Sequence, residues 1–200
     1  RIAILEKMAE ELYREWFVRL RFPGHEKTKI VKGVPEGWEV KKIGDVFDYL
    51  EGPGIRNWQY VNAGVPFINI RLINNGTIDL TNANHINESE AYGKYSHFLL
   101  EENDFVLSTS GSIGRGAIIQ SNHLPLCLNT SVIRFRPVNK KHYSYMYQFL
   151  KSYSFLSNVE MLANGSAQLN FGPTHLNFMK LIAPPDHIID KFCKSCESID

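Results

Sequence analysis

The sequence predicts an α+β fold: a mixed, β-rich globular domain flanked by long amphipathic helices. Three observations predict it. Apolar residues recur at helical spacing near both ends of the chain, short apolar segments cut by turn residues fill the middle, and 44% of the 200 residues are hydrophobic and 12% aromatic. That composition is sufficient for the core of one domain with appendages.

The first element is an amphipathic helix, which we place at residues 1–22. Its apolar stripe has spacings of three and four residues, with charged side chains on the opposite face. The stripe consists of Leu5, Met8, Leu12 and Trp16. Pro23 and Gly24 end the helix, and residues 23–34 are predicted to be a polar linker.

The central domain, residues 35–185, is predicted to consist mainly of short strands. The apolar segments that predict strands are residues 38–43, 46–49, 66–72, 104–109, 117–120 and 131–136. Turn residues separate them at residues 52–54, 74–76 and 111–116. A helix over residues 143–162 and a last strand over residues 178–182 complete the domain.

A second amphipathic helix is predicted over residues 186–200, with Asp186 as its N-cap. A folded domain does not need both an entering and a leaving amphipathic helix. We therefore expect the two flanking helices to pack on each other or on a partner. The alternative is that they simply cover the sheet.

Composition limits the class of protein. No run of eighteen apolar residues exists and the N-terminal residues are charged, so we expect no membrane contact and a cytoplasmic protein. The odd number of cysteines, three, fits a reducing compartment. Cys193 and Cys196 form a CxxC motif without a second Cys or His pair at zinc spacing, so no metal site is expected.

The chain has no recognisable catalytic motif. It lacks the Asn/Asp-Pro-Pro-aromatic tetrad that grips a flipped adenine and the carboxylate–lysine cluster that holds a metal ion at a phosphate. The glycine-rich segment 111–116 lacks the Lys-Ser/Thr of a P-loop and lies between two predicted strands, which favours a hairpin turn. The sequence therefore predicts a protein without catalytic activity, cofactor or metal ion.

Several loops carry side chains suited to reading DNA bases. Sequence readout needs Arg, Asn, Gln, Ser or Thr side chains that reach base edges, with donors to phosphates beside them. The candidates are Arg56, Asn57, Gln59, Arg71, Ser110, Ser112, Arg115 and Gln168. Gly, Asn and Ser are also the residues of tight turns, so turn formation is the alternative at each loop. Turn chemistry does not require the arginines, the glutamines or Trp58, and these favour binding.

Four ordered segments resemble one family. They are PEGWEVKKIGDVFDYLEG (35–52), GVPFINIRLINNGTID (64–79), ENDFVLSTSGSIGRGAI (102–118) and GSAQLNFGPTHLNFMKLIAPP (165–185). In this order they resemble the target-recognition domain of type I restriction specificity subunits, and residues 12–24 resemble the helical spacer that precedes it. Asp186-His187 departs from the Glu-Gln that the family often shows at the second spacer helix.

The resemblance implies a division of labour. Family members usually carry two recognition domains joined by two long antiparallel helices, so this chain would be half a subunit, either a fragment or a short form that pairs with itself. It would bind double-stranded DNA in the major groove. Modification subunits would use S-adenosylmethionine to methylate adenine, and a restriction motor subunit, using ATP and Mg²⁺, would cleave DNA. The chain itself would bind none of these cofactors. Partner docking is assigned to Leu5, Met8, Leu12, Trp16 and Phe17.

Two alternatives remain open. The chain could be the DNA-recognition fragment of a single-chain restriction–methylation enzyme, which predicts a methyltransferase motif upstream. It could also be a sugar- or protein-binding β-rich module, as the aromatic residues Trp58 and Tyr60 would allow. With a net charge of +1, DNA contact must come from local clustering or a partner, and we expect weak, salt-dependent binding without that partner.

Overall fold

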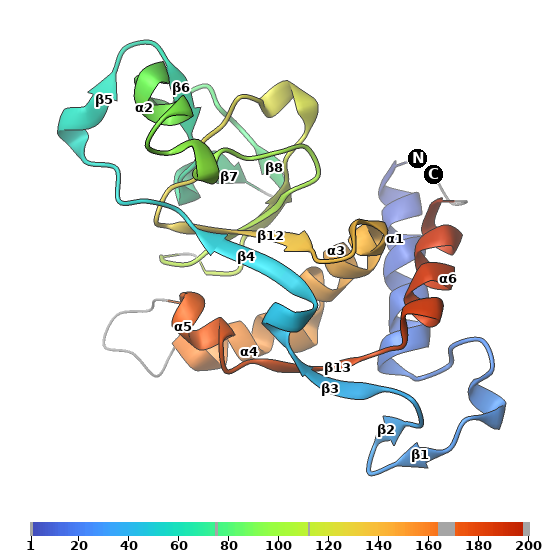
Figure 1. Ribbon diagram of the computed structural model, residues 1–200. Helices are drawn as coiled ribbons and strands as arrows, with labels where there is room; N and C mark the ends of the chain where they lie inside the picture. Colours follow the sequence, from blue (N-terminus) through green and yellow to red (C-terminus); the bar gives the residue numbers. More distant parts are fainter. Residues whose placement is uncertain (1, 75, 112, 164–170, 198–200) are drawn as a thin grey trace. The chain divides into compact units, whose positions relative to one another are not determined.

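The computed structural model describes residues 2–74, 76–111, 113–163 and 171–197. The chain forms two compact units, which Figure 1 draws in one ribbon. Unit 1 comprises Arg1–Phe47, Pro137–Ser152 and Asn177–Asp200, and unit 2 comprises Asp48–Arg136 and Tyr153–Leu176. Each unit is therefore assembled from segments that are distant in the sequence.

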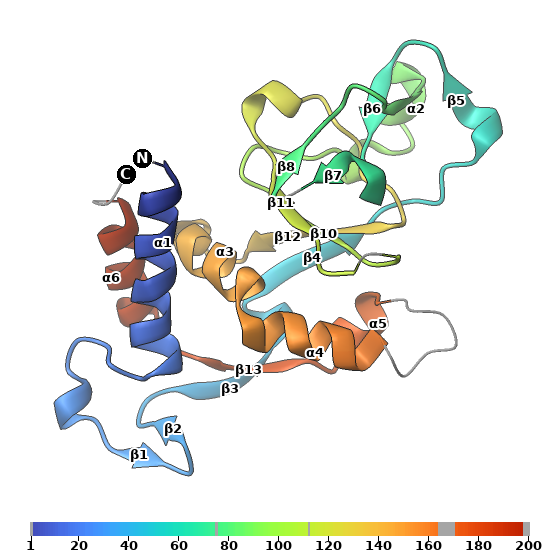
Figure 2. The same cartoon turned by 180° about the vertical axis from the view of Figure 1, so that it is seen from behind.

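Unit 1 is built around helices from both ends of the chain. Helix α1 (Ile2–Tyr13) continues as a π-helical turn, η1 (Arg14–Val18), and lies antiparallel beside α6 (Asp186–Glu197) (Figures 1 and 2). A third helix, α3 (Tyr143–Lys151), contacts both α1 and α6. The prediction that the two flanking helices pack on each other is confirmed.

An aromatic cluster joins these helices. The ring centroid of Phe17 lies 5.0 Å from those of Tyr145 on α3 and Phe192 on α6. The Trp16 ring lies 5.9 Å from Phe192, and the buried Tyr13 ring lies 6.1 Å from both Tyr145 and Phe192. Several of these pairs meet edge to face, a geometry that adds to the stabilisation from burial because ring edges and faces carry opposite partial charge.

Two small antiparallel strand pairs complete unit 1. Strands β1 (Ile30–Val31) and β2 (Val34–Pro35) form a hairpin in the segment that the sequence predicts as a linker. Strand β3 (Glu39–Lys42) pairs with β13 (Lys180–Ala183), so the start and the end of the predicted central domain are hydrogen-bonded to each other. The 3₁₀ turns of this unit are η2 (His25–Lys27), η3 (Ile43–Asp45) and η8 (Lys140–His142).

The main sheet of unit 2 has the strand order β11-β10-β12-β4. Its strands are β4 (Phe47–Glu51), β10 (Phe105–Ser108), β11 (Gly116–Ile118) and β12 (Val132–Pro137), of which Phe47 and Pro137 belong to unit 1. Strand β10 is antiparallel to both of its neighbours. Val106 on β10 lies opposite Ala117 on one side and Arg134 on the other.

Both faces of this sheet are covered. On one face, Val106 and Ala117 join a core cluster with residues of a hairpin formed by β7 (Ile73–Asn74) and β8 (Thr77–Ile78). On the other face, the ring of Phe135 meets the ring of Phe155 edge to face at 6.1 Å, which seats helix α4 (Tyr153–Ala163). Because strand β10 is covered on both faces, all four of its residues are buried and the first three are apolar.

A second, smaller sheet has the order β5-β9-β6. Its strands are β5 (Tyr60–Val61), β6 (Val65–Phe67) and β9 (Asn84–Ile86), and helix α2 (Glu88–Tyr92) follows β9. A separate core cluster lies between this sheet and the helix; it consists of Ile55, Val65, Phe67, Ile86, Ala91, Tyr95 and Cys127. The remaining short elements are η4 (Asn57–Gln59), η5 (Ile70–Leu72), η6 (Ser96–Phe98), η7 (Ser121–His123) and α5 (Pro173–Leu176).

Three predictions for individual elements are wrong. The single helix over residues 143–162 is interrupted at Ser152, which has an extended ψ of 145° and donates its hydroxyl to the carbonyl of Phe149 at 2.6 Å. Of the predicted strand 66–72, only the first two residues lie in a strand, and its last three form η5. Asp186 is the first residue of α6 rather than its N-cap, so it acts through its charge in the first helical turn.

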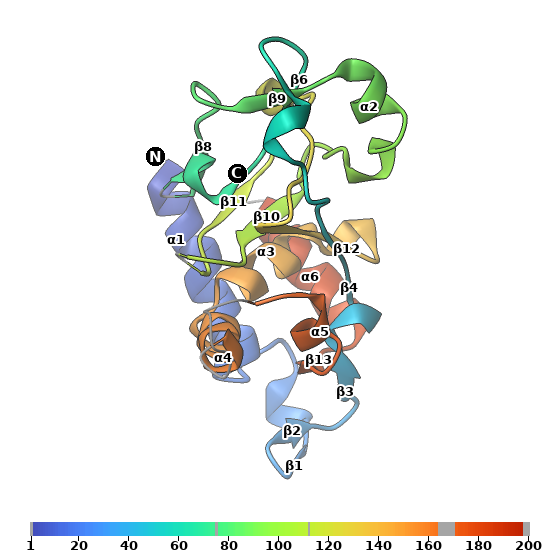
Figure 3. The ribbon, with the colours of Figure 1, turned by 90° about the vertical axis from the view of Figure 1, so that its left-hand side faces the viewer.

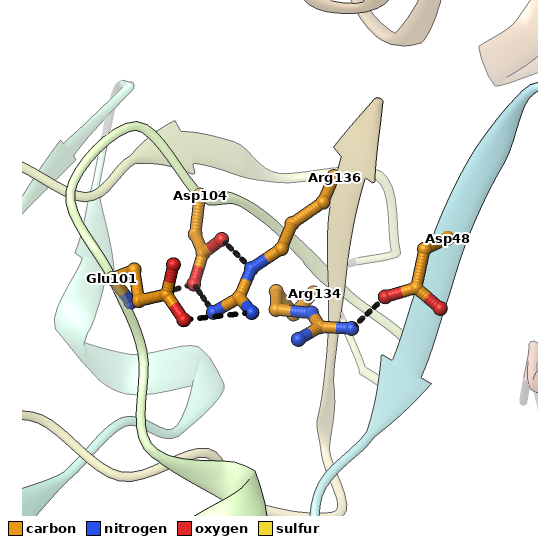
Figure 4. Close-up of polar contacts among 5 residues, drawn as sticks. All are labelled: Asp48, Glu101, Asp104, Arg134 and Arg136. Atoms are coloured by element: carbon orange, nitrogen blue, oxygen red, sulfur yellow. Dashed lines mark hydrogen bonds and ion pairs between the residues drawn. The ribbon is translucent and has the colours of Figure 1, made fainter. Parts of the chain in front are cut away.

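Two arginines of β12 form an ion-pair network within unit 2 (Figure 4). Arg136 holds Asp104 through Nε and through Nη2, the latter at 2.8 Å, and its Nη1 lies 3.0 Å from Glu101. Asp104 is only 2% exposed, so its charge depends on this pairing. The buried Arg134 contacts Asp48 through Nη2. The network ties β12 to β4 and to the loop that precedes β10.

Candidate nucleic-acid interface

Three loops of unit 2 meet at one end of the main sheet. Leu107 lies opposite Gly116 and Ser108 lies opposite Val132, so the loop between β10 and β11 and the segment before β12 leave the sheet at the same end. The segment after β4 joins them, because a Cβ added to Gly52 would lie 2.4 Å from the backbone nitrogen of Asn129. Only glycine permits that approach.

Backbone hydrogen bonds hold these loops together. Thr130 N–H donates to the carbonyl of Pro53 at 3.2 Å, and Thr109 N–H donates to the carbonyl of Ser131 at 3.0 Å. Phe171 N–H in turn donates to the carbonyl of Thr109 at 2.9 Å. Because backbone groups supply these three bonds, no exposed side chain is needed for them.

The loop between β10 and β11 comprises residues 109–115. Its base is closed by two bonds: Ser108 N–H donates to the carbonyl of Arg115 at 2.8 Å, and Arg115 N–H donates to Ser108 Oγ at 2.9 Å. Arg115 is exposed and Ser110 is half-buried. Ser112, the third predicted residue of this loop, lies outside the described residues.

The turn that carries Arg71 lies beside this loop. A Cβ added to Gly111 would lie 3.1 Å from Cδ1 of Ile70, which places η5 against the loop. Asn69 Oδ1 accepts the backbone N–H of Arg71 at 2.9 Å and fixes the turn, and Arg71 itself is exposed. We give the name sheet-end surface to the described residues of five segments: 52–54, 69–71, 109–115, 129–131 and 171–172.

Three further predicted residues, Arg56, Asn57 and Gln59, lie at the η4 turn. Gln59 is only 7% exposed: its Oε1 accepts Arg56 N–H at 3.0 Å and its Nε2 donates to the Tyr95 hydroxyl at 3.0 Å and to Glu90 at 3.4 Å. The amide of Gln59 is thus engaged within unit 2. Arg56 and Asn57 are exposed. Gln168 lies outside the described residues.

The sheet-end surface and the η4 turn lie along the same side of unit 2. In Figures 1 and 2, the corner formed by η4 and β5 and the loop between β10 and β11 are on one side of this unit, and Figure 3 turns that side toward the viewer. The structure therefore brings Ser110, Arg115 and Arg71 together and leaves Arg56 and Asn57 at a second position on the same side.

The distribution of charge over these segments is uneven, although the net charge of the whole chain is +1. Residues 52–78 contain no Asp or Glu, and Glu160 is the single acidic residue between positions 105 and 185. The same stretches contain exposed arginines: Arg56 and Arg71 lie in the first and Arg115 in the second. Burial also raises the pKa of Glu51, which adjoins the sheet-end surface, and so disfavours its negative charge. These stretches poor in acidic residues are a sequence signal for a nucleic-acid interface, and the prediction from side-chain type did not use it.

The residues predicted to dock partner subunits separate into two groups. Met8 on α1 is exposed, and Leu5 and Leu12 are half-buried. Trp16 and Phe17 pack within the aromatic cluster of unit 1. The spacing of apolar residues identified the helix, but it could not separate side chains that meet α6 from those that face away.

The described ranges contain neither a cluster of metal-binding side chains nor a helix fit to span a membrane. Within residues 2–74, 76–111, 113–163 and 171–197, no three His, Cys, Asp or Glu side chains are grouped so that they could hold a metal ion. Cys193 and Cys196 are buried on the apolar face of α6. No helix in the same ranges combines the length and apolar character needed to cross a bilayer.

Solved structures share the fold of this chain. The chain is similar to the HsdS subunit from Thermoanaerobacter tengcongensis, with a TM-score of 0.60 and 15% identity over 98% of this chain and 43% of that one. It is also similar to the type I restriction-modification S subunit from M. genitalium, with a TM-score of 0.50 and 15% identity over 99% of this chain and 51% of that one. At such identity the similarity shows a shared fold.

The sequence comparison then gives the family. The model of the type I restriction modification DNA specificity domain matches residues 35–191, and the chain belongs to that family. It is 28% identical to the type I restriction enzyme MjaIX specificity subunit of Methanocaldococcus jannaschii, over 94% of this chain and 44% of that protein. It is 25% identical to the EcoAI specificity subunit of Escherichia coli, over 79% and 28%. The chain thus spans less than half the length of these curated relatives.

Proposed function

We propose that this chain reads one half of a split DNA target for a type I restriction-modification complex. The observation that carries the proposal is the sheet-end surface: exposed, non-acidic side chains on loops that backbone hydrogen bonds hold in place. Arg71 and Arg115 are suited to gripping guanine O6 and N7 or phosphates, and Ser110 can donate to either. Arg56 and Asn57 would extend the contact along the same side of unit 2.

Preorganisation supports this assignment. Loops that are already fixed lose little conformational entropy when they bind, so more of the contact energy remains available for affinity. The absence of acidic residues from 52–78 removes a source of repulsion with phosphates.

The chemistry is assigned to partners. The relatives are named specificity subunits, and we propose that modification subunits dock on unit 1, with Met8, Leu5 and Leu12 of α1 as contacts. The partners would then methylate adenine with S-adenosylmethionine or cleave DNA with an ATP-dependent motor. Since the chain covers 44% of the MjaIX subunit, a second recognition half or a second copy of this chain would read the other half of the target.

The test is selection from a randomised duplex pool at fixed salt, with the chain alone and with the neighbouring modification subunit. A short enriched motif is expected, sharper when the partner is present. Arg115→Ala should weaken binding to the selected duplex by about tenfold, since one good base contact contributes roughly 1–3 kcal/mol. The control is Lys180→Ala, which removes an exposed positive charge from unit 1.

The outcomes separate the competing functions. Enrichment that Arg115→Ala weakens and Lys180→Ala leaves intact supports base reading by the sheet-end surface. Equal losses in both variants would indicate non-specific attraction to charge. If a folded chain with bound modification subunit enriches nothing, the chain is instead a binding module for another ligand.

A further inference from the structure

The most exposed indole of the described residues lies on the η4 turn. Trp58 is 82% exposed, whereas Trp38 is buried and Trp16 is half-buried in unit 1. Leaving a large aromatic side chain in water forgoes roughly 2 kcal/mol of burial. The proposed reading of bases by polar side chains makes no use of it.

The turn that presents Trp58 is rigid. Its neighbour Gln59 makes the three hydrogen bonds described above, to Arg56 N–H, the Tyr95 hydroxyl and Glu90. Tyr95 is itself buried in the core cluster beneath the small sheet. The backbone at Trp58 is therefore held in place, so little backbone entropy is lost when a partner covers the side chain.

The surroundings of Trp58 favour a nucleic acid over a protein as that partner. Arg56 and Asn57, the exposed side chains beside it, supply a positive charge and an amide. The acidic residue that contacts the turn, Glu90, is half-buried and accepts a hydrogen bond from Gln59 Nε2 at 3.4 Å. The turn also lies on the same side of unit 2 as the loop between β10 and β11 (Figure 1). A duplex that contacts that loop can pass the turn as well.

We propose that Trp58 packs against the bases of the bound duplex as an apolar contact, with Arg56 on the adjoining phosphate. This inference rests on the proposed function. Aromatic side chains bind bases through their flat faces, and apolar side chains can insert at a base step and widen it. Trp58 would thus add affinity that depends on how readily the local step unstacks, which is a form of sequence preference.

An apolar contact and a phosphate contact respond differently to salt. Removing a phosphate contact lowers the slope of log affinity against log salt by about one, because fewer counterions are released. Stacking releases no counterions. Trp58→Ala should therefore weaken binding by about tenfold at every salt concentration and leave the slope unchanged, while Arg56→Ala should lower the slope.

The experiment measures affinity for the selected duplex over a salt series, using the full chain with its modification subunit. The variants are Trp58→Ala, Trp58→Phe and Arg56→Ala, with Phe178→Ala as the control because it removes an equally exposed aromatic side chain, 84% exposed, from unit 1. Acrylamide quenching is measured in parallel. The difference between wild type and Trp58→Phe reports Trp58, and it should be protected when the duplex is added.

Each outcome of this experiment either supports or overturns the proposed contact of Trp58. A loss for Trp58→Ala at constant salt slope, partial recovery with Phe, and protection of Trp58 from acrylamide support the contact. Wild-type affinity in Trp58→Ala with Trp58 still open to acrylamide overturns it and leaves the proposed function standing. Loss of modification-subunit binding in Trp58→Ala also overturns it and assigns Trp58 to a protein contact. If the wild-type complex binds no duplex, the proposed function and this contact both fail.

Discussion

The sheet-end surface and the η4 turn hold their exposed side chains in different ways. The sheet-end surface is held mainly by main-chain hydrogen bonds such as Thr109 N–H to the Ser131 carbonyl, with Asn69 fixing the turn of Arg71, so the exposed side chains of Arg71 and Arg115 are not needed to hold it. The η4 turn is held by one side chain, Gln59. Both segments contain polar residues that are candidates for base reading in the sequence. At the η4 turn, however, one of them, Gln59, stabilises the turn instead. A polar loop residue can therefore be identified as a reader only after its hydrogen bonds are known.

The largest expected effect lies at the close approach of Gly52 to Asn129. Gly52→Ala places a Cβ 2.4 Å from a backbone nitrogen, so strands β4 and β12 must separate at this end. We expect a loss of about 3 kcal/mol in the free energy of unfolding, measured by urea denaturation. Gly54→Ala is the matched control, because no atom lies within 4 Å of its added Cβ. Equal stability of the two variants would contradict the close packing of these loops.

The next effect tests the structural role of Gln59. Gln59→Leu leaves the Tyr95 hydroxyl and Arg56 N–H without this partner, and we expect a loss of about 2 kcal/mol in unfolding free energy. Asn57→Ala on the same turn should change stability by less than about 0.5 kcal/mol, because that side chain is exposed. A stable Gln59→Leu protein would return Gln59 to the candidates for base reading.

The third prediction has the opposite pattern: affinity for DNA should fall while stability stays unchanged. Arg71→Ala removes an exposed side chain from a turn fixed by Asn69, so the unfolding free energy should remain within about 0.5 kcal/mol of wild type. Affinity for the selected duplex should fall by about tenfold, measured by fluorescence anisotropy. Unchanged affinity at matched salt would remove Arg71 from the sheet-end contacts.

The smallest effect concerns pH. The η7 turn uses the same device as η4, since His123 Nδ1 accepts Gln120 N–H at 3.0 Å, but a histidine can titrate. Burial lowers the pKa of His123, so the unfolded chain takes up the proton first as pH falls below the ordinary value of about 6.5. The contribution of His123 to stability is therefore present above that pH and is lost through the lowered pKa.

Urea midpoints from pH 7.5 to 5 measure this change. His123→Asn serves as the control because its amide oxygen can accept the same N–H without titrating. The decline that belongs to His123 should be absent from this variant. An identical decline in both proteins would assign the pH dependence to other groups.

Local patterns predicted much of the fold because they depend on neighbours in the sequence. Glycine-rich segment 111–116 does connect two antiparallel strands, and the apolar stripe of the first helix does form α1. The pairing of β3 with β13 was not predictable in this way, because those strands lie far apart in the chain. The same holds for Asp104 and Arg136, which are ordinary charged residues until the fold pairs them.

The sequence by itself determined the family, the α+β class and the presence on loops of side chains suited to base readout, because these follow from residue order and composition. Tertiary structure decided which of those side chains remain available. Gln59 is turned inward by Tyr95 and Glu90, Phe17 is held by Phe192, and the turn of Arg71 is placed beside the loop of Arg115. The physical reason is that hydrogen-bond partners and burial are set by residues distant in the chain, and local propensity carries no information about them.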